Sequence, residues 1–223
     1  MNKDLFILVI GHARSGTSLC AGLLNESPEI KIGFEINNLR LVENGKNDKV
    51  IFSEELTGNK ICILSDLCCD KLIESIEEKK VIMHDKWKKL KVIFVKRNVI
   101  SSMVSKKFRE LNKGKPAKFD GIVKGHAICE NKIKRLKKYF KDYFIFDFDK
   151  AVFSWEYVGE MFKYVGIRYE KKYFTEFKNV KNYRYGGGVS PHFVQFGMPE
   201  KCEKDRLKFE QLIRLHEPWL LNG

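Results

Sequence analysis

The stretch Asp4-Leu-Phe-Ile-Leu-Val-Ile10, followed directly by Gly11-His-Ala-Arg-Ser-Gly-Thr-Ser18, contains the strongest fold signal in the sequence. Its first part is short, apolar and rich in β-branched residues, as expected of a strand that is buried on both faces. Leucines at positions 19, 23 and 24 then fall on one face of a helix that we expect to begin near Ser15. A buried strand that turns through glycines into a helix is typical of an α/β protein.

The rest of the chain alternates in the same way between strand-like and helix-like segments. We expect further strands at residues 30–33, 60–64, 81–83, 91–95 and 143–148, a loop at 110–120, and helices at 66–79, 99–109, 122–141, 152–165 and 203–216. This alternation predicts a three-layer α/β/α fold with a mostly parallel central sheet. The length of 223 residues predicts a single domain over residues 1–223.

Composition excludes several classes of protein. A hydrophobic fraction of 43% and a mean hydropathy of -0.34 fit a soluble globular protein and exclude a disordered or coiled-coil chain. No apolar run approaches the roughly 20 residues of a membrane span, and Gly11 interrupts the first run too early for a signal peptide. We therefore expect a cytoplasmic protein. The six cysteines contain no CxxC pair, so we expect free thiols and no metal site.

Positive charge is concentrated in one central block. The whole chain has a net charge of +13, and residues 81–141 alone hold 19 Lys/Arg against 4 Asp/Glu. Such a block attracts anions, which include nucleic acid, an anionic membrane and a phosphorylated or sulfated small molecule.

Two segments carry residues suited to binding phosphate-like groups. The glycines of the 11–18 loop let successive N–H groups at a helix N-terminus point at an anion. The loop has the GxxxxG spacing of a Walker A motif, but Thr17 stands in place of its lysine, and Arg14 lies inside the loop instead. The second segment places Arg97 at the carboxyl end of the 91–95 strand and Ser105 about two turns into the next helix, where they suit a second phosphate.

Together the two segments resemble the cytosolic and bacterial sulfotransferases that use 3′-phosphoadenosine-5′-phosphosulfate, PAPS. In that family a [K/R]-S-G-T-[T/S] loop matches Arg14 to Ser18, and an R-N-P-x-x-x-x-x-S segment matches Arg97 and Ser105, with Val99 in place of the usual proline. The resemblance extends to Asp85-Lys86 and to residues 143–165. It implies a P-loop NTPase-like sulfotransferase fold with PAPS as co-substrate and no metal.

The resemblance also implies residue roles. The residues implied in binding PAPS, or its product 3′,5′-adenosine bisphosphate (PAP), are Arg14, Ser15, Gly16, Thr17 and Ser18 at the 5′-phosphosulfate, Arg97 and Ser105 at the 3′-phosphate, and Arg184 and Gly186 in a late loop. Arg14 and Lys86 are expected to stabilise charge on the leaving group. Glu35 is the first candidate for the general base and His84 the second.

The first functional hypothesis is therefore a sulfotransferase that moves a sulfuryl group from PAPS to a hydroxyl or amine by in-line attack. The alternative is a P-loop kinase or NTPase in which residues 144–147 would supply an acidic strand end for magnesium. A nucleic-acid binder is a third hypothesis, but no recognised motif accompanies the charge, so we expect no nucleic-acid partner. The sequence does not identify the acceptor, which could be a carbohydrate or another small molecule. Residues 36–59 and 110–125 are expected to shape its pocket.

Overall fold

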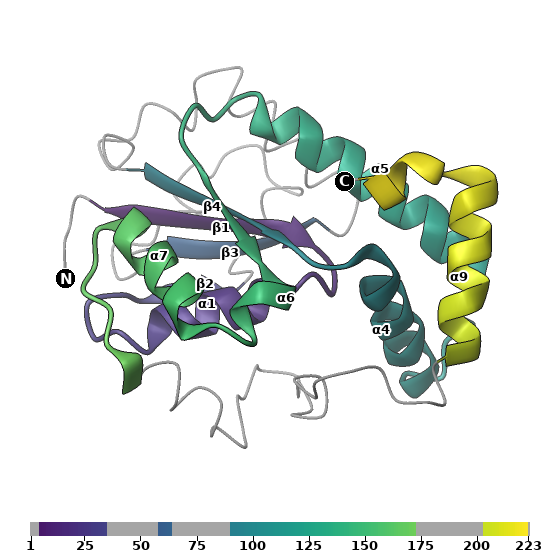
Figure 1. The fold of residues 1–223 in the computed structure, drawn as a ribbon, viewed down its shortest axis with the longest axis horizontal. Helices are drawn as coiled ribbons and strands as arrows, with labels where there is room; N and C mark the ends of the chain where they lie inside the picture. Colours follow the sequence, from purple (N-terminus) through teal and green to yellow (C-terminus); the bar gives the residue numbers. More distant parts are fainter. Residues whose placement is uncertain (1–4, 35–57, 64–89, 173–202, 223) are drawn as a thin grey trace, which may run out of the picture.

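A parallel five-stranded sheet forms the centre of the computed structural model, which describes residues 5–34, 58–63, 90–172 and 203–222 (Figure 1). The strands are β1 (Phe6–His12), β2 (Ile32–Phe34), β3 (Gly58–Ile63), β4 (Leu90–Lys96) and β5 (Phe144–Asp147), in the spatial order β2-β3-β1-β4-β5. Every pairing between neighbours is parallel. All seven residues of β1 are buried, as expected for the central strand of a sheet covered on both faces.

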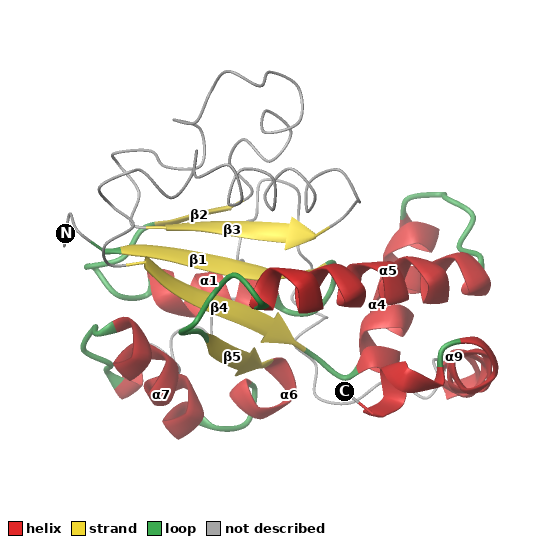
Figure 2. Cartoon of the chain, turned by 90° about the horizontal axis from the view of Figure 1, so that it is seen from above, coloured by secondary structure: helices red, strands yellow, loops and turns green. Residues whose placement is uncertain are grey.

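Helices cover both faces of the sheet, which confirms the predicted α/β fold. On one face lie α1 (Thr17–Asn25), α6 (Phe148–Ala151) and α7 (Trp155–Val165), and on the other lies α5 (Phe119–Lys137) (Figures 1 and 2). The remaining helices, α4 (Val99–Asn112), α9 (Glu203–His216) and the 3-10 helix η5 (Pro218–Asn222), lie beyond the carboxyl ends of β1 and β4. None of the helices in the described ranges is long and apolar enough to cross a membrane.

Within the described residues, two hydrophobic clusters hold these layers together. The larger one joins the sheet to α1 and α7, with fully buried side chains such as Val9, Leu23 and Phe162. The second joins α4, α5 and α9 through residues that include Met103, Val123 and Phe209. Because the second cluster anchors α4, it fixes the direction in which that helix leaves the carboxyl edge of the sheet.

Several element boundaries differ from the sequence-based expectations. The first strand continues to His12, and its helix begins at Thr17 rather than Ser15. The predicted loop at 110–120 was too long, because α4 extends to Asn112 and α5 already begins at Phe119. The short helix α6 was not predicted. The predicted helix at 66–79 and strand at 81–83 lie outside the described residues.

Candidate functional site

The loop between β1 and α1 has the backbone geometry of an anion cradle. Ser15 N donates to His12 O at 3.2 Å, and Cys20 N donates to Gly16 O at 3.0 Å, where α1 begins. Arg14 and Gly16 both have left-handed backbone angles, with φ of 72° and 100°. Glycine adopts this conformation readily, whereas a non-glycine residue held there carries strain of the kind found at binding sites. The loop ends with the N–H groups of α1 facing outward from its N-terminus, the geometry that attracts anions.

Both loop glycines are required by close packing. A Cβ at Gly11 would lie 2.6 Å from Ser15 Oγ and 2.6 Å from Thr17 Cγ2. A Cβ at Gly16 would collide with the ring of Phe148. Ser15 is fully buried, and its Oγ makes no hydrogen bond to any described residue. The glycines thus allow the loop to pack closely against Ser15, Thr17 and Phe148.

Arg97 and Ser105 meet this loop although they are more than eighty positions away from it in the sequence. Arg97 Nη1 donates to Arg14 O at 3.4 Å, and Arg14 Nε donates to Ser105 Oγ at 3.1 Å. The Arg97 guanidinium also lies over the ring of Phe148, 4.3 Å from its centroid. Burial lowers the pKa of Arg97, and the charge of Asp149 opposes that shift. The structure therefore brings Arg14, Arg97 and Ser105 into one cluster at the carboxyl edge of the sheet.

The start of α4 positions Ser105. Asn98 is the N-cap, and its side chain accepts a hydrogen bond from Ser101 N at 3.0 Å. Asn98 N in turn donates to Asp149 Oδ2 at 2.6 Å, which ties the cap to α6. Val99, which stands where the related motif has proline, is the first helical residue, the position at which proline is favoured. Its presence therefore leaves the helix start intact.

Lys60 is a cation near the loop that the sequence analysis did not single out. It lies on β3 beside β1, is only 2% exposed, and its Nζ is 3.5 Å from Ser18 Oγ in the first turn of α1. A lysine side chain is almost never fully buried unless its charge is paired. In the sequence Lys60 is the one charged residue of the apolar stretch 60–64, but nothing there indicates that this strand lies beside the loop.

Several predicted site residues lie outside the described residues. These are Glu35, His84, Lys86, Arg184 and Gly186, together with positions 36–57 of the expected acceptor pocket. Their roles as base, leaving-group stabiliser and closing loop stay predictions. Of the other acceptor stretch, 110–125, most is helical, because it is formed by the end of α4 and the start of α5.

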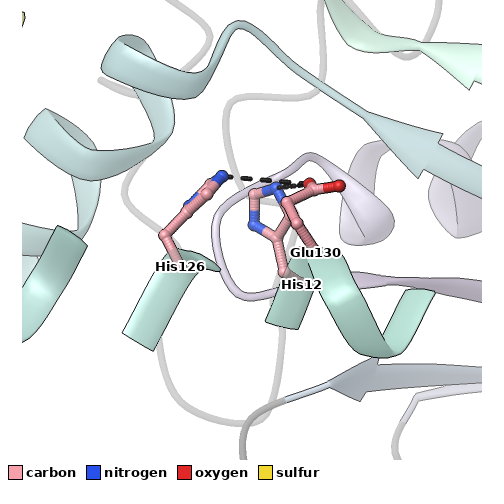
Figure 3. Close-up of side chains that lie close together, drawn as sticks. All are labelled: His12, His126 and Glu130. Carbon is pink, nitrogen blue, oxygen red and sulfur yellow. Dashed lines mark ion pairs between the residues drawn. The ribbon is translucent and has the colours of Figure 1, made fainter. Parts of the chain in front are cut away.

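A second polar cluster, which sequence reasoning missed, lies on the face of β1 that is covered by α5 (Figure 3). His12 Nε2 is 3.3 Å from Glu130 Oε1, and His126 Nε2 is 3.9 Å from the same oxygen. Burial, with a smaller contribution from His12, lowers the pKa of His126 to about 3. Burial alone would raise the pKa of Glu130, but His12, His126 and Lys137 outweigh it and the pKa is lowered. The i,i+4 spacing of His126 and Glu130 indicates that these two share a helix face, but it does not indicate that His12 lies opposite them.

Comparison with known proteins gives a structural likeness without a sequence match. No family model and no curated protein matches the sequence. The structure is similar to a sulfotransferase from Alicyclobacillus acidocaldarius, with a TM-score of 0.52 and 12% identity over 96% of this chain and 94% of that one. This chain has a sulfotransferase-like fold.

Two further sulfotransferase structures are more distantly similar. The sulfotransferase domain of the Synechococcus PCC 7002 olefin synthase has a TM-score of 0.48 and 8% identity, over 94% of both chains. A mouse sulfotransferase complexed with PAP has a TM-score of 0.43 and 11% identity, over 97% of this chain and 87% of that one.

Proposed function

We propose that this chain is a PAPS-dependent sulfotransferase that transfers a sulfuryl group to a hydroxyl or amine acceptor and releases 3′,5′-adenosine bisphosphate. The observation that carries the proposal is the contact of Arg14 with Ser105 and of Arg97 with Arg14 O. Those contacts unite the two segments that resemble the phosphosulfate-binding and 3′-phosphate-binding motifs. They lie at the carboxyl edge of a parallel sheet, where α/β proteins bind their ligands.

The chemistry of the donor matches this arrangement. PAPS carries anionic groups at both ends of one adenosine, so it needs two neighbouring cationic sites. In the proposal the loop and Arg14 hold the 5′-phosphosulfate, with Lys60 near Ser18 adding positive charge. Arg97 and Ser105 hold the 3′-phosphate. Charge that builds on the bridging oxygen of the leaving group is stabilised by Arg14 and by loop N–H groups, each such donor contributing about 2.7 to 4 kcal/mol.

The alternative of a magnesium-dependent kinase or NTPase fits the residues less well. Its proposed acidic strand end, Asp147, lies on β5, which β4 separates from β1. The Asp147 side chain already caps α6 through the N–H groups of Asp149 and Lys150, and its other oxygen lies 3.5 Å from Lys96 Nζ. A carboxylate with these partners is poorly placed to hold a metal ion at the loop.

The remaining catalytic roles complete the proposal. Glu35 is the first candidate to accept the acceptor's proton and His84 the second, because a carboxylate or imidazole is the usual base in such a step. Lys86 is proposed to stabilise the leaving group, and Arg184 with Gly186 to close over the 3′-phosphate.

Isothermal titration calorimetry tests the proposal. The bisphosphate should bind without magnesium, and Arg97→Ala should weaken it about 10-fold to 100-fold, the range expected for hydrogen bonds to a charged group. Arg109→Ala, which removes an exposed arginine late in the following helix α4, is the matched control and should leave the affinity unchanged. Tighter binding of ATP-magnesium than of the bisphosphate would transfer support to the kinase alternative. Transfer of labelled sulfate from PAPS to a panel of acceptors then identifies the substrate.

A further inference from the structure

Three metal-ligating side chains converge between β1 and α5. His12 ends β1, and His126 and Glu130 lie one turn apart on α5 (Figure 3). One ligand atom from each can be chosen so that all three lie within 4.8 Å of one another. The two histidines are 3% and 5% exposed, and their ring centroids are 4.1 Å apart.

The hydrogen bonds of the cluster orient one histidine. His12 Nδ1 lies 3.0 Å from Ala13 O, and because a carbonyl oxygen only accepts, this nitrogen carries a proton. His12 Nε2 therefore faces Glu130 Oε1. A backbone carbonyl that holds the outer nitrogen of an imidazole is the usual support behind a metal-ligating histidine.

A proton between His12 and Glu130 would satisfy those two residues but not the third. His126 Nε2 is buried and makes no hydrogen bond to any described residue. Its separation of 3.9 Å from Glu130 Oε1 is too long for a hydrogen bond. A cation bound among the three atoms would give every one of them a partner, which a single proton does not.

We propose that His12, His126 and Glu130 form a binding site for a divalent transition-metal ion, with zinc as the metal that best fits the donor set. Two imidazole nitrogens and one carboxylate oxygen are a known three-ligand set for zinc. Zinc–nitrogen bonds of about 2.0 to 2.1 Å place tetrahedral ligand atoms about 3.3 Å apart. The two separations from Glu130 Oε1, 3.3 and 3.9 Å, are close to this value. The three ligand atoms span at most 4.8 Å, so the histidines would have to move inward to bind the ion.

Such an ion would join the end of β1 to α5. His12 is adjacent to the loop that contains Arg14, so the metal would act as a brace at the base of that loop. Lys106 and Lys137 contribute positive charge to the surroundings of the cluster, so the imidazoles have to supply much of the affinity. Cysteine spacing, one of the two grounds on which we expected no metal site, has no bearing on a site of this kind.

Zinc and cobalt titrations of the untagged full chain, after treatment with a chelator, test this inference. Calorimetry should show a zinc site that Glu130→Gln and His126→Gln each weaken at least about 100-fold, since even partners of the ligands contribute 10-fold to 100-fold. His216→Ala, which removes an exposed histidine on α9, is the control and should bind zinc like the original chain. No nucleotide enters the assay, so its outcome is independent of the proposed sulfotransferase activity.

X-ray absorption of the zinc-loaded chain gives a readout that needs no variant. Nitrogen and oxygen neighbours at about 2.0 to 2.2 Å, without sulfur near 2.3 Å, are expected for this site. Sulfur neighbours would place the ion on cysteines and overturn the inference, as would unchanged zinc affinity in Glu130→Gln. If either glutamine variant fails to fold, as judged by circular dichroism without metal, the absorption spectrum of the original chain decides.

Discussion

Replacing Gly16 with alanine tests whether the anion loop and Arg97 depend on one packed aromatic ring. Gly16 has φ of 100°, a conformation that costs an L-residue about 1 to 2 kcal/mol. Its new Cβ would also collide with Phe148 Cδ2 and lie 3.1 and 3.2 Å from two other ring carbons. Overpacking of this kind costs about 1 to 3 kcal/mol, so the free energy of unfolding should fall by about 2 to 5 kcal/mol in all.

The same substitution should weaken ligand binding. The Phe148 ring lies under the Arg97 guanidinium, 4.3 Å from its centre, so a displaced ring moves the cation proposed to hold the 3′-phosphate. The bisphosphate affinity of the folded variant, measured by calorimetry, should therefore decrease along with the stability measured by urea unfolding.

Gly166→Ala separates the cost of the left-handed backbone conformation from the cost of the collision with Phe148. Gly166 ends α7 with φ of 78°, and nothing described lies within 4 Å of a Cβ built there. This control should lose only the backbone contribution of about 1 to 2 kcal/mol and should keep its affinity for the bisphosphate. Equal losses of stability at Gly16 and Gly166, or unchanged bisphosphate binding by Gly16→Ala, would refute the reasoning.

Three other measurements probe the site and its supports. Ser105→Ala should weaken bisphosphate binding about tenfold in calorimetry, because a hydrogen bond to a charged group is lost; unchanged affinity would remove Ser105 from the site. Asn98→Ala should lower the free energy of urea unfolding by about 1 kcal/mol through loss of the N-cap, and no change would contradict the capping role. Burial and the charge of His12 lower the pKa of His126 to about 3, although the charge of Glu130 acts in the opposite direction. In the unfolded chain the pKa of a histidine is about 6.5. As the pH falls, the unfolded chain therefore takes up a proton at this histidine before the folded chain does, which favours unfolding. The free energy of unfolding is unaffected by this group above about pH 6.5 and decreases between about pH 6.5 and 3, by up to about 1.4 kcal/mol per pH unit. Urea unfolding of the chelator-treated chain between about pH 7 and 4.5 should show a shallower slope for His126→Gln, and equal slopes would argue against a neutral buried His126.

Elements with a strong local pattern were predictable from the sequence. The apolar run before Gly11 identified the central strand, and the helix expected at 203–216 is observed as α9 (Glu203–His216). The helix α6 has no such pattern, because four residues are too few to show a helical period. It forms where the Asp147 side chain accepts from the N–H groups of Asp149 and Lys150, at 3.1 and 3.4 Å. Such a cap is visible only once the end of β5 is placed.

The residues of the candidate site likewise form two groups, those that could be predicted from the sequence and those that could not. Arg14, Arg97 and Ser105 could be grouped in advance because each follows the carboxyl end of a strand, and parallel strands bring those ends to one edge. Lys60 and the His12–His126–Glu130 cluster could not, because their contacts depend on which strands are neighbours and on how α5 crosses β1. Spacing along the chain does not contain that information.

The environment of Arg97 is easier to understand as a binding site than as a structural ion pair. Its guanidinium is partly buried, and its Nε makes no hydrogen bond to any described residue. Asp149, whose charge raises the pKa of Arg97, uses Oδ2 to accept from Asn98 N. Stacking on Phe148 offsets only about 0.5 to 2 kcal/mol of the cost of desolvating a cation. A structural arginine would be expected to pair fully with such a carboxylate. In the proposed function the 3′-phosphate, bound next to the loop by Arg97 and Ser105, would supply this missing partner.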